Sequence, residues 1–189
     1  MIYITGDTHG EFGRVEAFCE RFQTKREDIL IILGDAGINF SRGMRDGLKK
    51  RFLEELPITL FCIHGNHEQR PITIDTYKEM NWRGGTVYYE EEYPHLLFAK
   101  AGEVFDFDRK KTIVIGGAYS VDKMVRLMCG YGWWQDEQPS TESWLDEIED
   151  KLDYGKWYCG HYHTEKKIEK MEIMFENFDI FCRNDIGIT

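Results

Sequence analysis

The sequence has few basic residues for its acidic content. It carries 24 Lys and Arg against 34 Asp and Glu, for a formal net charge of -10 and a pI of about 5.1. This balance argues against broad electrostatic binding to nucleic acid or to an anionic membrane. The acidic balance does not exclude a phosphate-bearing substrate, because divalent cations bound in a cleft reverse the local electrostatic field.

Cysteines are few and scattered, and long apolar runs are lacking. The five cysteines show no CxxC spacing, which is typical of reduced thiols, several of them core residues. The first residues lead directly into a candidate active-site loop, which leaves no room for a signal peptide. No apolar run approaches membrane-spanning length. We therefore expect a cytoplasmic protein with neither a membrane nor a nucleic-acid partner; its oligomeric state stays open.

The length of 189 residues predicts one domain, residues 1–189. A domain of this size buries roughly 70% of the surface of its unfolded chain and needs no disulfides to fold. Hydrophobic residues make up 42% of the chain and charged residues 31%, as in globular proteins.

Three short apolar strands, each followed by a glycine-containing loop, are predicted in the first half. They cover Ile2–Ile4, Ile29–Leu33 and Ile58–Ile63, and continuous apolar runs of this length suit strands buried on both faces of a sheet. Apolar residues at helical spacing separate them, from Phe12 to Phe22 and from Leu48 to Leu56. This alternation predicts a largely parallel sheet, so the three polar loops should converge at its carboxyl edge.

The second half is richer in strands. A helix is expected after Ser140 or Thr141, with Trp144, Leu145, Ile148 and Leu152 on its buried face. Further strands are predicted at Leu96–Ala99, Glu103–Phe107, Thr112–Gly116, Lys156–Cys159, Met171–Phe175 and Phe178–Cys182. The best assembly is one α/β domain with two packed sheets.

The polar loops carry carboxylate, imidazole and amide groups, which are ligands for divalent metals. Asp7 and His9 are two residues apart, so both side chains can point the same way from a strand end. His161 and His163 repeat that spacing. The Asp35 carboxylate has two oxygens and can bridge two ions.

Two ions about 3.5 to 4 Å apart suit in-line displacement at phosphorus, since they acidify a water and offset charge on the phosphoryl oxygens. His67 follows Asn66 directly and is placed to give a proton to the leaving oxygen. An alternative is that His67 only orients a ligand. His64 is interpreted as a packed histidine and His95 as a surface loop residue. Trp133 and Trp134 either stack on a substrate ring or cover a core edge.

The four glycine-containing blocks resemble the ordered signature of the calcineurin-like metallophosphoesterases. They are Gly6-Asp7-Thr8-His9-Gly10, Gly34-Asp35, Gly65-Asn66-His67-Glu68 and Gly160-His161-Tyr162-His163. The resemblance spans nearly the whole chain and implies a four-layer αββα sandwich of two mixed sheets. It also implies a dinuclear centre, in which Asp7, His9, Asp35 and His163 hold one metal ion, and Asp35, Asn66 and His161 hold the other. Mn²⁺ is expected first, with Fe, Zn, Co or Ni as alternatives.

Two departures separate the chain from the family pattern. The second block lacks the Arg that often follows its Asp. The family also has a further metal-binding His before the last block, but no His lies between His95 and His161. The resemblance therefore implies that a segment near Pro139 has been lost. The function expected is metal-dependent hydrolysis of a phosphomonoester, phosphodiester or phosphoprotein; the alternative is a catalytically impaired relative that binds metal or a partner.

Overall fold

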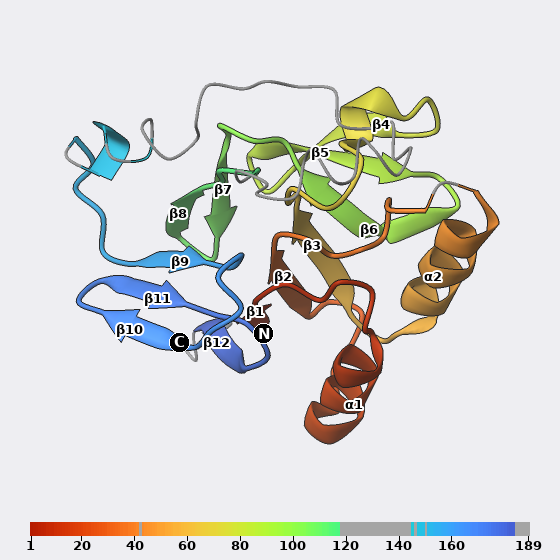
Figure 1. Cartoon of the computed structure of the whole chain (residues 1–189), viewed down its shortest axis with the longest axis horizontal. Helices are drawn as coiled ribbons and strands as arrows, with labels where there is room; N and C mark the ends of the chain where they lie inside the picture. The colour runs from red at the N-terminus through yellow and green to blue at the C-terminus, as the bar shows by residue number, and fades with distance from the viewer. Residues whose placement is uncertain (42, 118–144, 146, 150, 184–189) are drawn as a thin grey trace, which may run out of the picture.

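The computed structural model describes residues 1–41, 43–117, 145, 147–149 and 151–183. These residues form a mixed α/β fold with one large sheet and two smaller sheets (Figure 1). The helices are α1 (Gly13–Phe22), α2 (Met44–Glu55) and the short 3-10 helix η1 (Pro71–Thr73). None of the helices that the structure describes is long and apolar enough to span a bilayer.

The large sheet has seven strands in the order β12-β1-β2-β3-β6-β5-β4. The pairs β1–β2, β2–β3 and β3–β6 are parallel, and the outer strands pair antiparallel. All three polar loops of the first half therefore leave the same edge, as the sequence predicts. The strands are β1 (Ile2–Thr5), β2 (Ile29–Leu33), β3 (Thr59–Ile63), β4 (Lys78–Trp82), β5 (Gly85–Glu90), β6 (Tyr93–Ala99) and β12 (Phe178–Cys182).

Two smaller sheets come from the second half of the chain. The hairpin of β7 (Val104–Phe107) and β8 (Lys110–Ile113) forms one, and the other has the order β10-β11-β9. Its strands are β9 (Trp157–Cys159), β10 (Lys166–Ile168) and β11 (Met171–Ile173). The short strand β9 pairs only with β11 within the described residues, and β8 only with β7.

Both faces of the large sheet are buried. On one face, Val15 and Phe18 of α1 and Leu53 of α2 pack in one core with Leu30 and Leu60 of the sheet. On the other face, a second core joins the sheet to the smaller sheets; its members include Ile4, Ile31, Phe61, Phe105, Phe107 and Phe181. Burial on both sides explains why β1, β2 and β3 are continuous apolar runs rather than alternating ones.

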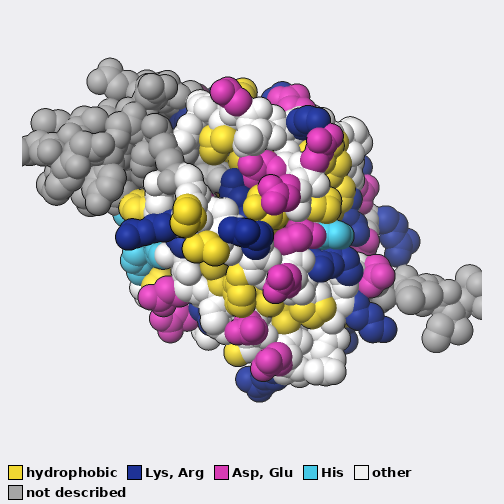
Figure 2. Space-filling view, turned by 90° about the vertical axis from the view of Figure 1, so that its right-hand side faces the viewer, with side chains coloured by type: hydrophobic (Ala, Val, Ile, Leu, Met, Phe, Trp, Pro, Cys, Tyr) yellow, Lys and Arg dark blue, Asp and Glu magenta, His cyan; other side chains and the backbone are white. Residues whose placement is uncertain are grey.

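The surface is mixed in charge where Figure 2 shows it. Basic and acidic side chains are interspersed with apolar ones over the face that carries α2 (Figure 2). No broad basic patch gathers on that face.

Several predicted elements differ in detail from those in the structure. The predicted strand Thr112–Gly116 is shifted, since β8 covers Lys110–Ile113. The sequence did not predict β4, β5 or β10. Both β4 and β10 are mostly exposed and lack an apolar run. Leu48 is exposed on α2, and His95 lies in β6, where it pairs with Glu54. The predicted helix after Ser140, Trp133, Trp134 and the region around Pro139 lie largely or wholly outside the described residues.

Candidate metal centre

The loop after β1 carries Asp7, whose side chain is 1% exposed. Both of its carboxylate oxygens accept the backbone N–H of His161, at 2.9 and 3.0 Å. Burial raises the pKa of Asp7, and the neighbouring Asp35 carboxylate raises it further, against the opposing effect of that N–H group. The first and last loops of the predicted site are thus joined at this carboxylate.

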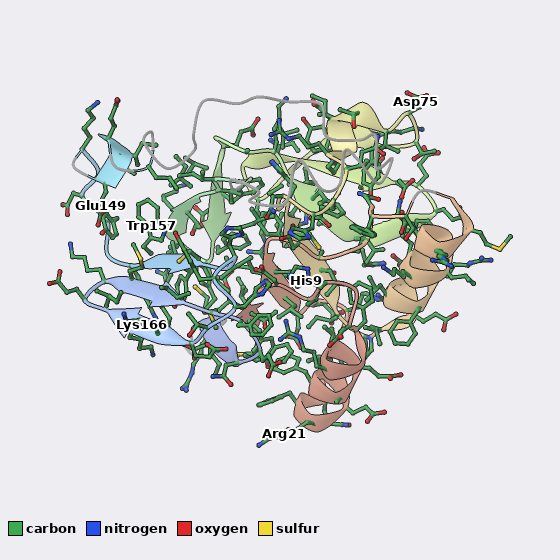
Figure 3. The ribbon with its side chains drawn as sticks, viewed as in Figure 1. His9, Arg21, Asp75, Glu149, Trp157 and Lys166 are labelled. Atoms are coloured by element: carbon green, nitrogen blue, oxygen red, sulfur yellow. The ribbon has the colours of Figure 1, made fainter. Side chains whose placement is uncertain are left out.

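His9 and His163 face the same carboxylate. Their Nε2 atoms lie 3.7 and 3.5 Å from Oδ2 of Asp7 and 2.9 Å from each other. Figure 3 shows His9 near the centre of the molecule, on the loop that follows β1. The ring of His163 stacks on Phe175 at a centroid distance of 4.8 Å, which fixes its plane.

A second group of donors lies beside the first and shares His9. Ligand atoms of His9, Asp35 and His67 all lie within 4.8 Å of one another, as do those of Asp7, His9 and His163. Oδ1 of Asp35 accepts the backbone N–H of His67 at 2.6 Å, so the loops after β2 and β3 are joined through this carboxylate. The structure therefore brings together five of the seven side chains that the sequence singled out.

The His161 side chain belongs to neither donor group, and Asn66 offers an amide oxygen rather than an imidazole nitrogen or a carboxylate. Asn66 is buried, and its Oδ1 atom has no hydrogen-bond partner among the described residues. A buried amide oxygen without a partner is costly unless something satisfies it, and a cation would do so. The His161 side chain is exposed and in neither donor group, whereas its backbone N–H holds Asp7.

The backbone of the site is strained at several donors. His9, Asp35, His161 and His163 all have positive φ, between 37° and 72°, a region that side-chain-bearing residues seldom adopt. Two glycines allow the close approach. A Cβ on Gly160 would lie 2.1 Å from Oδ1 of Asp7. A Cβ on Gly65 would lie 2.0 Å from Oδ1 of Asp35. Only glycine fits at either position.

Two residues that support the loops had no role in the sequence analysis. The buried Glu68 carboxylate accepts the backbone N–H groups of Gly37 and Gly65, at 3.1 and 3.3 Å. Burial, with the Asp35 charge, raises the pKa of Glu68 to about 8. The Arg14 guanidinium donates to the carbonyl oxygen of Asp7 at 2.7 Å. The Gly65-Asn66-His67-Glu68 block pointed to Glu68, whereas no sequence motif marks Arg14.

The donor set fits divalent metal ions. It combines two nearly buried carboxylates, imidazole nitrogens and an unpartnered amide oxygen, which are the donors that such ions take in proteins. Two carboxylates so close together and buried repel each other, and a cation between them would remove that cost.

Among the comparisons with known proteins, a family match agrees with this chemistry. A family model described as calcineurin-like phosphoesterase matches residues 1–183. A search of curated proteins found no significant match. Among solved structures, a protein of unknown function from Aquifex aeolicus is similar at 15% sequence identity and a TM-score of 0.40. That match covers 94% of this chain and 89% of the other.

Proposed function

The chain belongs to the calcineurin-like phosphoesterase family, and from this premise we propose that it hydrolyses phosphate esters with divalent metal ions. The observation that carries the proposal is the pair of adjoining donor groups that share His9. Ions bound there would activate water and offset charge on the phosphoryl oxygens. Mn²⁺ is the ion proposed first, and the substrate is a phosphomonoester, phosphodiester or phosphoprotein.

The ligands proposed are Asp7, His9, Asp35, Asn66, His161 and His163. Asp7 and His163 would serve the first ion with His9, and Asp35 would bridge to the second. The buried Oδ1 of Asn66 supports its place there. His161 has the weakest support, because its side chain lies outside both donor groups.

His67 is proposed as the proton donor to the leaving oxygen. Its backbone is held by Asp35 at 2.6 Å, and its ring lies edge-on to His9 at a centroid distance of 5.4 Å. The ring is thus beside the place where the phosphoryl group would bind. A donor must reach the leaving atom within hydrogen-bond distance, and the side chain is only partly buried, so substrate can approach it.

The test is hydrolysis of bis-p-nitrophenyl phosphate by metal-stripped protein titrated with Mn²⁺. We expect turnover that depends on the metal and is lost in Asp35→Asn, whose amide oxygen can still accept the His67 N–H. The matched control is Asp75→Asn, an exposed carboxylate far from His9 (Figure 3). Equal rates in Asp35→Asn and the unmodified chain would sink the proposal.

A second candidate function for this chain is metal binding without catalysis. The position of the His161 side chain, outside both donor groups, favours it, because the second ion would then have few protein ligands. Metal binding by calorimetry together with no hydrolysis, in protein shown to be folded, would support this candidate over the enzyme.

A further inference from the structure

An apolar cavity opens directly onto the candidate metal centre. Its volume is about 810 Å³, within the range of roughly 300–1,000 Å³ typical of small-molecule sites. One end is lined by Asp7, Asp35, Asn66 and His161. The remaining wall is predominantly apolar, and includes Ile31, Leu33, Phe61, Ile63, Ile115 and Trp157.

The cavity exists because the smaller sheets are separate. It lies between the face of the large sheet that carries Phe61 and the strands β8 and β9, which both contribute to its wall. These two strands belong to different sheets, so no continuous second sheet closes over the large one within the described residues. In Figure 1, β8 and β9 lie on the same side of the large sheet.

Exposed apolar side chains gather at this cavity. Val104 is 47% exposed and Ile113 is 41% exposed, and the two are directly opposite each other in the β7–β8 hairpin. Both line the cavity, as do the exposed Leu152 and Tyr162. Apolar side chains left in solvent around a concave surface are typical of a binding site.

The basic residues of the wall are engaged elsewhere. Lys110 donates to the carbonyl oxygen of Phe181 at 2.8 Å. Lys111 pairs with Asp106, and Lys156 pairs with Glu172. Protein partners thus partly offset the charge of these lysines, and the rest of the wall is predominantly apolar, which favours an apolar group over a polyanion or a heavily hydroxylated group.

We propose that the cavity binds the apolar group of the substrate, a phosphate ester of an aromatic or branched aliphatic alcohol. The phosphoryl group would lie at the end that holds Asp7, Asp35 and Asn66, and the organic group would lie against Ile63, Ile113 and Val104. The inference rests on the proposed phosphoesterase function and adds the class of substrate to it.

The first test is binding, measured by calorimetry with non-hydrolysable probes in the presence of Mn²⁺. The probes are 1-naphthylphosphonate and methylphosphonate, which share the phosphoryl end and differ in the apolar group. We expect the naphthyl compound to bind at least about 10-fold more tightly, a modest share of what burial of an aromatic ring supplies. Equal affinities would overturn the inference.

The second test places a charge in the cavity. Ile113→Glu alters an exposed wall position, so the variant should fold; its matched control is Ile72→Glu, which is 65% exposed and outside the cavity. We expect Ile113→Glu to abolish the preference for the naphthyl probe over methylphosphonate and to lower kcat/KM for 1-naphthyl phosphate at least about 10-fold, with no such effect of Ile72→Glu. An unchanged preference in Ile113→Glu would overturn the inference.

These outcomes separate the two proposals. Metal-dependent hydrolysis without a preference for the apolar probe would overturn the substrate class and leave the phosphoesterase function standing. A preference for the naphthyl probe that Ile113→Glu removes, without hydrolysis of any ester, would support the cavity as the binding site and overturn the catalytic function.

Discussion

The ring nitrogens of His9 and His163 face each other, with their Nε2 atoms 2.9 Å apart, although 154 positions separate the two residues in the chain. A neutral imidazole has one N–H, so two neutral rings at this distance share one proton. Both Nε2 atoms also lie close to Oδ2 of Asp7, at 3.7 and 3.5 Å. The pair is therefore arranged to bind one cation in common.

Asp35→Ala should weaken the binding of both metal ions, whereas His9→Ala should weaken the binding of one. The reason is that the Asp35 carboxylate has two oxygens and can bridge two ions, whereas the Nε2 atom of His9 has one lone pair and can bind one ion. The loss of affinity should exceed the roughly 10–100-fold that removal of an outer-shell partner costs. Metal equivalents per chain are measured by mass spectrometry after equilibrium dialysis against Mn²⁺. Tyr162→Ala, at a neighbouring exposed position, is the control; two full equivalents in Asp35→Ala would contradict the prediction.

Gly160→Ala should disrupt the site and lower the free energy of unfolding by about 1–3 kcal/mol, the usual cost of overpacking. The added Cβ would lie 2.1 Å from the Asp7 carboxylate and 2.2 Å from the Leu33 carbonyl oxygen, so the loop must move. Urea unfolding and Mn²⁺ titration measure both effects. Gly155→Ala is the matched control, because its Cβ would meet nothing within 4 Å; similar behaviour of the two variants would rule out this account.

Asp7→Asn should make the metal-free protein more stable and less responsive to Mn²⁺. Burial and the Asp35 charge raise the pKa of Asp7, which means that the ionised form is disfavoured in the fold. The amide removes that charge and can still accept the His161 N–H. In the unmodified chain, Mn²⁺ at 100 times its dissociation constant should add about 2.7 kcal/mol. Thermal melts with and without Mn²⁺ test this; equal stabilisation of both proteins by the ion would refute it.

Glu68→Ala should lower the free energy of unfolding by about 1–3 kcal/mol, because buried backbone N–H groups lose their partner. The Glu68 side chain accepts backbone N–H groups of two loops with separate oxygens, and alanine offers no acceptor. Metal affinity should fall with stability, since both loops carry donors. Glu20→Ala, on the exposed face of α1, controls for loss of an exposed carboxylate. No change in either quantity would show that Glu68 does not support the loops.

Acid should destabilise the metal-free protein partly through His64. Burial lowers the pKa of His64 from 6.5 to about 4, with a further contribution from Arg70. Between these values the unfolded chain binds a proton that the folded chain does not, so stability falls as the pH drops from about 6.5 to 4. The His64 ring is only partly shielded from solvent. We therefore expect the free energy of unfolding to fall by roughly 2 kcal/mol, which is less than the full pKa shift would give.

The His64 effect is isolated by comparison with His64→Gln. Glu68, whose pKa is raised to about 8, acts in the opposite sense and makes the fold less stable as the pH rises from 4.5 to 8. That contribution is present in both proteins and cancels in the difference. A difference in the free energy of unfolding that does not vary between pH 4 and 7 would show that His64 titrates normally.

The sequence by itself determined the framework of the site. The apolar runs at Ile2–Ile4, Ile29–Leu33 and Ile58–Ile63 predicted β1, β2 and β3 to within one residue, because strands buried on both faces contain few polar positions. Parallel pairing then required the loops that hold Asp7, Asp35 and Asn66 to meet at one edge. Both of these results follow from local pattern and chain connectivity alone.

Tertiary structure alone decided how the donors are arranged at that edge. The ring positions of His9 and His163 depend on positive φ angles, which such residues adopt only when surrounding contacts compensate the strain. For the same reason, the sequence could not reveal that His161 holds Asp7 through its backbone while its side chain lies apart. The separation of β8 from β9, and with it the cavity, likewise depends on which distant strands pair, and short exposed strands carry little local information about their partners.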